Sequence, residues 1–123
     1  KNLSHLELRY NQLEYLPDSI GNLQSLSFLT LSGNCLTKLP DSIGKLQRLD
    51  TLYLGENQLT VLPESIGNLK NLRYLYLPQN HLTSLPKSIG KLKGLQDLLL
   101  DKRFLRQKEE LQRKLYFSRI RFW

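Results

Sequence analysis

The sequence repeats itself every 23 residues, and this period limits the possible folds more than any other feature. Four near-copies follow one another without insertion, and each begins with Leu-Pro. A repeat this short cannot bury its apolar residues alone, so its copies must stack and share one continuous core. The period therefore predicts an elongated array. The copies occupy residues 16–38, 39–61, 62–84 and 85–107.

Each copy contains a short segment with the pattern of a strand. In "LRYLYLPQNHL", residues 72–82, Leu75 and Leu77 alternate with Tyr74 and Tyr76. This period of two is typical of a half-buried strand. Equivalent leucines one repeat apart should stack about 4.8 Å from each other in a parallel sheet. The SIGxL stretch that follows each Leu-Pro predicts a short helical or 3-10 turn on the other side of the array.

The leucine spacing, LxxLxLxxNxL, resembles that of the leucine-rich repeat family in its 23-residue LPxSIGxLxxLxxLxLxxNxL form. The resemblance covers residues 1 to about 105. It implies an α/β repeat fold, a right-handed solenoid with a parallel concave β-sheet and short convex helical turns. Such repeats occur in bacterial surface and secreted proteins and in cytosolic scaffolds of plants and animals. The fold alone does not define a function.

Three further positions recur in the array. In the family, the asparagine amide bonds loop backbone groups that no strand partner reaches, so we expect an internal ladder here. The glycine of SIG should allow tight backbone packing or a positive φ. The acidic residues after Leu-Pro, Asp18, Asp41 and Glu64, are expected to cap the turn that follows. The ladder asparagines are Asn11, Asn34, Asn57 and Asn80.

The two ends of the array differ. The chain enters within a partial first repeat, without a polar cap, so we expect further repeats or another chain to cover that end. Residues 106–123 are predicted to be a cap: an amphipathic helix that buries Leu111 and Leu115, then a sixth strand. Phe117, Ile120 and Phe122 have the LxxLxL spacing of that strand. A helix-then-strand tail of this kind is most like that of bacterial family members.

Charge and cysteine content limit the cellular environments in which the protein could work. The net charge is +7, and residues 85–123 carry the whole excess. Cys35 is the single cysteine, which excludes an internal disulfide and favours a cytosolic-type reducing environment. The bacterial resemblance adds secretion from bacteria into a host cell as an alternative. No apolar run approaches the roughly 18 residues of a membrane helix.

Motifs for catalysis are absent from the sequence. His5 and His81 lie far apart in the array, and no CxxC, HExxH, GxSxG or phosphate-loop motif is present. We therefore assign no catalytic residue, no metal site and no cofactor, and we expect no enzymatic activity.

The residues that alternate with the inward leucines should line the concave face in three columns. Tyr53 and Tyr76 are neighbours across strands, and Tyr74 lies on the same strand as Tyr76, so the centre of this face is aromatic. The first column is His5, Phe28, Thr51, Tyr74, Asp97 and Arg119; the second is Glu7, Thr30, Tyr53, Tyr76, Leu99 and Arg121; the third is Arg9, Ser32, Gly55, Pro78, Asp101 and Trp123.

An aromatic centre with a polar rim is the usual anatomy of a protein interface. We therefore predict that another protein binds the first two columns and Arg9. We expect no small-molecule substrate, nucleic acid, membrane or obligate homo-oligomer. Three alternatives stay open: aromatic residues that only stabilise the strands, a purely structural segment of a larger scaffold, and anion binding by the basic cap.

Overall fold

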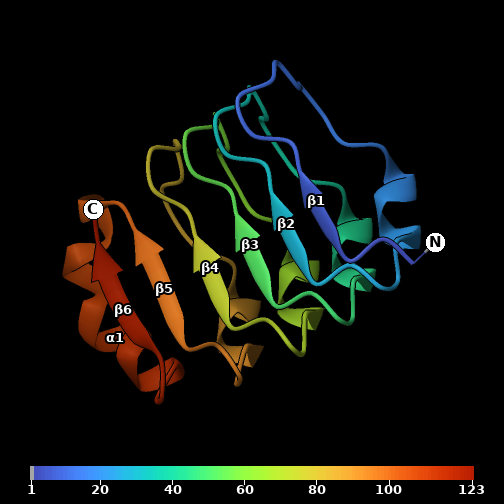
Figure 1. Ribbon diagram of the computed structural model, residues 1–123. Coiled ribbons are helices and arrows are strands. Elements are labelled where there is room, and N and C mark those ends of the chain that lie inside the picture. The colour runs from blue at the N-terminus through green and yellow to red at the C-terminus, as the bar shows by residue number, and fades with distance from the viewer. Residues whose placement is uncertain (1) are drawn as a thin grey trace.

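The computed structural model describes residues 2–123. Six parallel strands form one sheet in chain order (Figure 1). Leu29, Leu52 and Leu75 are paired in register, so the 23-residue period sets the pairing. The predicted parallel repeat sheet is confirmed. The strands are β1 (His5–Glu7), β2 (Phe28–Thr30), β3 (Thr51–Tyr53), β4 (Tyr74–Tyr76), β5 (Asp97–Leu100) and β6 (Arg119–Phe122).

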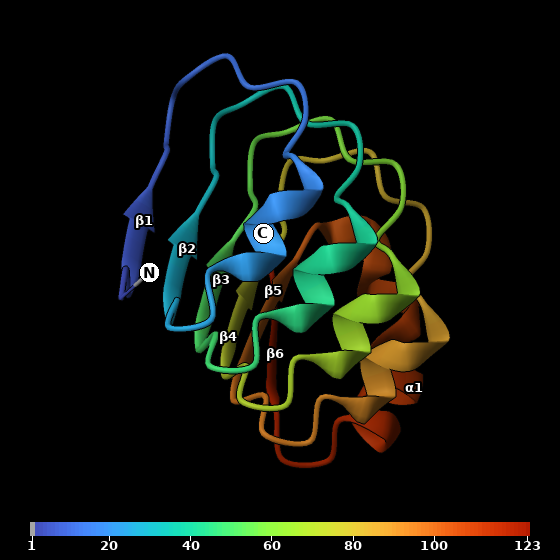
Figure 2. The same ribbon diagram turned by 90° about the vertical axis from the view of Figure 1, so that its right-hand side faces the viewer.

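The helical segments form a second layer on one side of the sheet (Figure 2). Each SIG stretch forms a 3-10 turn, as the sequence predicts, and these turns stack on one another. No helix among residues 2–123 is long and apolar enough to cross a membrane. The segments are η1 (Asp18–Asn22), η2 (Asp41–Lys45), η3 (Glu64–Asn68), η4 (Lys87–Lys91), η5 (Lys102–Gln107) and α1 (Lys108–Lys114).

The core lies between the two layers and is made almost wholly of leucine and isoleucine. Leu52, Leu75 and Leu98 are fully buried in the centre of the array. Leu6, the equivalent residue on β1, is only partly buried, because no repeat covers its outer side among the described residues. Burial is therefore complete in the middle of the solenoid and incomplete at its N-terminal end.

The predicted asparagine ladder is present in the middle of the array. Asn57 accepts a hydrogen bond from the backbone N–H of Leu36 at 3.0 Å and donates to the carbonyls of Leu31 and Leu54 at 2.9 and 3.1 Å. Asn11 is exposed and donates only within its own repeat. Arg103 replaces the asparagine near the cap and, having only donors, it donates to the carbonyl of Leu82.

The turns decide between two alternatives for the glycines and overturn the expectation for the acidic residues. The glycines of η1 to η3 serve close packing and not a positive φ: a Cβ on Gly44 would lie 2.5 Å from the carbonyl oxygen of Ser65. The prediction that Asp18, Asp41 and Glu64 cap their turns is wrong. A proline holds each N-cap position, and no side chain bonds there. Glu64 instead accepts a hydrogen bond from the backbone N–H of Ser88 in the next repeat.

The C-terminal cap closes the array as predicted, with one difference. Leu111 and Leu115 are buried, and β6 pairs with β5. Phe117, which the spacing places inward, is 83% exposed. Leu115 occupies the interior just before it, and Ser118 is buried after it, where its hydroxyl donates to the carbonyl of Leu95 at 2.6 Å. The chain therefore turns Phe117 outward.

Candidate protein-binding face

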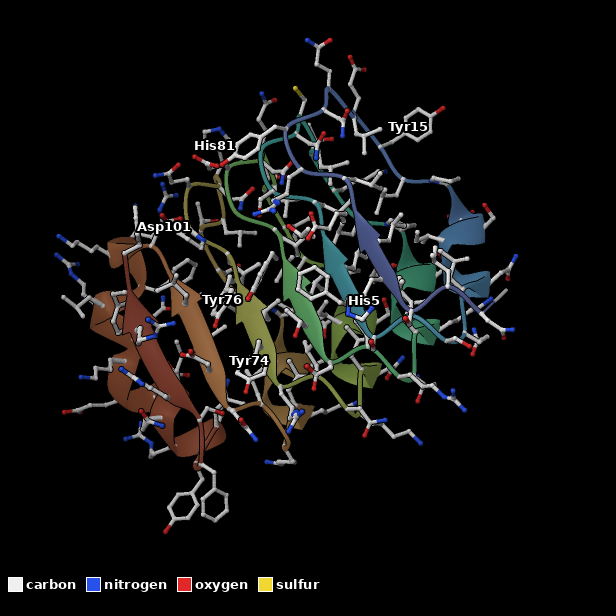
Figure 3. All side chains as sticks on the ribbon, viewed as in Figure 1. His5, Tyr15, Tyr74, Tyr76, His81 and Asp101 are labelled. Carbon is white, nitrogen blue, oxygen red and sulfur yellow. The ribbon has the colours of Figure 1, made fainter. Side chains whose placement is uncertain are left out.

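The side of the sheet that faces away from the turns is the concave face. Figure 3 shows His5, Tyr74 and Tyr76 on the strands of this face. Their neighbours within each strand, such as Leu75 between the two tyrosines, point into the core and are buried. The alternation therefore divides each strand into a structural side and a side that is free to vary.

Aromatic rings from four strands form a continuous row across the concave face. His5 stacks on Phe28 at 5.6 Å between ring centroids, and Phe28 meets Tyr53 edge to face, also at 5.6 Å. Tyr53 stacks on Tyr76 at 4.5 Å. The guanidinium of Arg121 lies 5.9 Å from the Tyr76 ring and extends the row toward the cap. We call His5, Phe28, Tyr53 and Tyr76 the aromatic row.

Tyr74 lies beside the row. Its hydroxyl donates to Gln96 Oε1 at 3.2 Å, and the guanidinium of Arg73 is 5.9 Å from its ring. Arg73 in turn pairs with Asp50. These contacts hold Tyr74 against the strand ends, and the ring stays half-exposed.

An ion pair fixes the cap end of the face. Arg121 donates to both carboxylate oxygens of Asp97, at 3.0 and 2.8 Å. The Tyr76 hydroxyl donates to the same carboxylate at 3.2 Å. Burial, and after it the negative charge of Asp97, raises the pKa of Tyr76 to about 12. The same carboxylate raises the pKa of Arg121 further, so this end carries a neutral tyrosine and a closed ion pair at physiological pH.

The remaining predicted site residues are not all exposed. Glu7 and Arg9 pair with each other at 3.2 Å on the open side of β1. Leu99 is half-buried, and Arg119 is exposed and forms no ion pair among residues 2–123. Thr30 and Thr51 are buried, 0% and 7% exposed. Larger side chains flank both threonines in register, so a partner could not reach them in this conformation.

The structure adds three residues that the sequence reasoning missed. Tyr10, Glu56 and Gln79 occupy the position just before the ladder asparagine, each with a positive φ. With Tyr53, Tyr76 and Trp123 they line a shallow hollow of about 310 Å³ at the carboxyl ends of the strands. The sequence feature that could have identified these three residues is their shared position in the repeat, which holds a different side chain in each copy. We call this space the rim hollow.

No group of three or more His, Cys, Asp or Glu side chains within residues 2–123 could hold a metal ion. The thiol of Cys35 is free.

Comparison with known proteins identifies the family. The profile described as "Leucine-rich repeat region" matches residues 1–72, and a "Leucine rich repeat" profile matches residues 47–102. The chain belongs to the leucine-rich repeat family, as its spacing predicts. Leucine-rich repeats are generally protein–protein interaction modules and are typically not enzymes. A search of curated proteins found no match.

Solved structures show the same solenoid. A leucine-rich repeat protein of Leptospira interrogans is 38% identical, with a TM-score of 0.79, and the match covers 98% of this chain and 37% of that one. The plant peptide hormone receptor RGFR1, in complex with RGF2, is 41% identical over 81% of this chain and 17% of its own, with a TM-score of 0.72.

An internalin, inlF, of Listeria monocytogenes has the same fold with a TM-score of 0.76. It is 21% identical over 98% of this chain and 34% of its own. The chain thus spans well under half the length of each of these structural relatives.

Proposed function

We propose that the chain is a recognition module that holds a partner protein on its concave face, with the aromatic row and Tyr74 at the centre. The charged residues at the two ends of the sheet, β1 and β5–β6, would form the rim of the contact. They are Glu7 and Arg9 on one side and Asp97, Arg119 and Arg121 on the other, with Leu99 between the row and the cap.

The continuity of the aromatic row carries this proposal. Four rings contact one another in sequence across β1 to β4, while their leucine neighbours already complete the core. The fold does not require rings there, because threonine occupies equivalent places at Thr30 and Thr51. Tyrosine is enriched at interface hot spots, and a sheet that is already ordered loses little entropy on binding.

We further propose that the protein is a bacterial effector, or the regulator of one, that captures or blocks another protein in a reducing environment. The 38% identity to the Leptospira protein supports a bacterial source, and the free thiol of Cys35 is compatible with reducing conditions. The identity of a captured partner tests it. A host-cell protein whose activity falls on binding is the expected result, and a partner that needs oxidising conditions to bind would contradict it.

The test of the binding face compares two triple alanine variants in affinity capture. Tyr53, Tyr74 and Tyr76 are replaced in one variant, and the matched control replaces three exposed rings elsewhere, Tyr15, Tyr116 and Phe117. Circular dichroism verifies that both are folded. A partner retained by the wild type and the control, and lost by the concave variant, supports the proposal. Equal capture by all three overturns it.

A further inference from the structure

We propose that the rim hollow receives one lysine or arginine side chain of the bound partner, with Glu56 supplying the opposite charge. The inference rests on the proposed function for its partner and specifies the chemistry that the partner must present.

A chain of hydrogen-bonded side chains from separate repeats forms the wall of the rim hollow. The Tyr10 hydroxyl donates to Glu56 Oε1 at 3.0 Å. The Gln79 amide lies between a carboxylate, which only accepts, and an indole N–H, which only donates, and this fixes its orientation. Its nitrogen donates to Glu56 Oε2 and its oxygen accepts from Trp123 Nε1, each at 3.2 Å.

Gly33 makes this wall possible. Tyr10 must extend past the next repeat to reach Glu56, two repeats away. At Gly33 a Cβ would lie 2.3 Å from Tyr10 Cδ1, so any other residue would displace the ring. The φ of Gly33 is +76°, which glycine adopts without strain.

The same backbone turn is strained at the other wall positions. Tyr10, Glu56 and Gln79 have φ values of 56°, 57° and 66° without being glycine. Such conformations are uncommon for residues with a Cβ and concentrate at functional sites. Here the strained turn aims each side chain over the hollow. The same turn occurs at Gly33, so the repeat itself sets this conformation and brings the three side chains into one line.

Glu56 supplies a negative charge to the wall of the rim hollow. Its two oxygens accept from neutral donors, and within residues 2–123 it forms no ion pair. Arg9, which also lines the hollow, forms an exposed ion pair with Glu7, and Arg121 pairs with Asp97. The hydrogen bond to the Glu56 carboxylate also raises the pKa of Tyr10. A cation that enters the hollow therefore meets an unpaired carboxylate.

The shape and lining suit a long cationic side chain. The stacked rings of Tyr53 and Tyr76 form an apolar floor that can pack methylene groups. Aromatic rings attract cations, and Tyr10 and Trp123 stand at the two ends of the wall. A purely apolar side chain would displace water from Glu56 without supplying an opposite charge, which is unfavourable. Lysine and arginine can both pack their methylene groups on the two tyrosine rings and pair their charge with Glu56.

The single tryptophan makes the test direct, because all tryptophan emission comes from Trp123 at this hollow. The protein is titrated with N-acetyl-arginine methylamide, with the lysine equivalent, and with N-acetyl-citrulline methylamide, a neutral analogue of the arginine probe. Ionic strength is held constant. We expect a saturable change in emission with both cationic probes and about tenfold weaker binding of citrulline, since charge-assisted hydrogen bonds are the stronger ones.

Two variants complete the test. Glu56→Gln should remove the preference for the charged probes, and Glu64→Gln, an exposed acid on the convex side, should keep it. Equal binding of arginine and citrulline probes, an unaffected Glu56→Gln, or no saturable change at the solubility limit would overturn the inference. No partner protein is present, so such a failure leaves the capture test of the concave face intact.

Discussion

The two sides of the same six strands follow different rules. On the inner side, Leu29, Leu52, Leu75 and Leu98 are the same residue in register, and all are fully buried. On the concave side, the equivalent positions hold histidine, phenylalanine, threonine, tyrosine, aspartate and arginine. Residues that the repeats share therefore hold the array together, and residues that differ give this array its own surface. The comparison predicts that substitutions on the inner side lower stability more than substitutions on the concave side.

The largest effect on stability should come from the inner side. Leu75→Ala leaves a cavity between Leu52 and Leu98, and we expect it to lower the free energy of unfolding by about 2–5 kcal/mol. Urea unfolding followed by circular dichroism measures this loss. Tyr74→Ala, on the same strand but on the concave side, serves as the control and should cost less. A larger loss from Tyr74→Ala would contradict the division between the two sides.

The asparagine ladder sharpens the comparison along the array. Asn57→Ala removes the acceptor for Leu36 N–H and the donor to two buried carbonyls, and we expect a loss of about 1–3 kcal/mol. Asn11→Ala removes bonds that are exposed to water and should cost less than about 1 kcal/mol. Equal losses in urea unfolding would show that the ladder does not strengthen toward the centre.

Two buried threonines on the concave side should respond with opposite signs. The hydroxyl of Thr30 has no hydrogen-bond partner, so Thr30→Val should raise stability by about 1 kcal/mol. The hydroxyl of Thr51 donates to Asp50 Oδ2 at 2.9 Å, so Thr51→Val should lower stability by a similar amount, about 1 kcal/mol. Valine keeps the β-branch and hence the strand preference. Changes of the same sign in thermal or urea unfolding would contradict this assignment.

The last prediction applies only at alkaline pH. The pKa of Tyr76 is raised to about 12 in the fold, against about 10 in an unfolded chain. The unfolded state loses this proton first, so the stability contribution is complete below pH 10 and is lost as the pH rises toward 12. Tyr76→Phe should show a shallower decline in unfolding free energy across this window. An identical decline in both proteins would contradict the raised pKa.

The regular part of the fold could be predicted from spacing alone. The 23-residue period set the strands, their register and the 3-10 turns, because every repeat solves the same packing problem. Even β6 was predicted, since Ile120 and Phe122 continue the leucine positions of β5. The orientation of Phe117 was not, because it depends on Leu115 and Ser118 filling the interior first.

The candidate site was predicted only in part, for a similar reason. Alternation placed Tyr53 and Tyr76 side by side, and the structure shows them stacked. The rim hollow depends on side chains that reach across repeats: Tyr10 passes Gly33 to meet Glu56. The burial of Thr30 depends on the size of its neighbours in register. The period predicts the strand and the face on which each residue lies. It does not predict contacts between side chains of different repeats, because these depend on the size and length of each side chain.

The most direct test of the central claim is hydroxyl-radical footprinting of the tyrosines, with and without a captured partner. Tyr15 and Tyr116, 73% and 76% exposed away from the concave sheet, are internal controls. The account predicts that oxidation of Tyr53, Tyr74 and Tyr76 falls on binding while that of the two controls is unchanged. Protection of Tyr15 or Tyr116, with the three concave tyrosines oxidised as in the free protein, would contradict it.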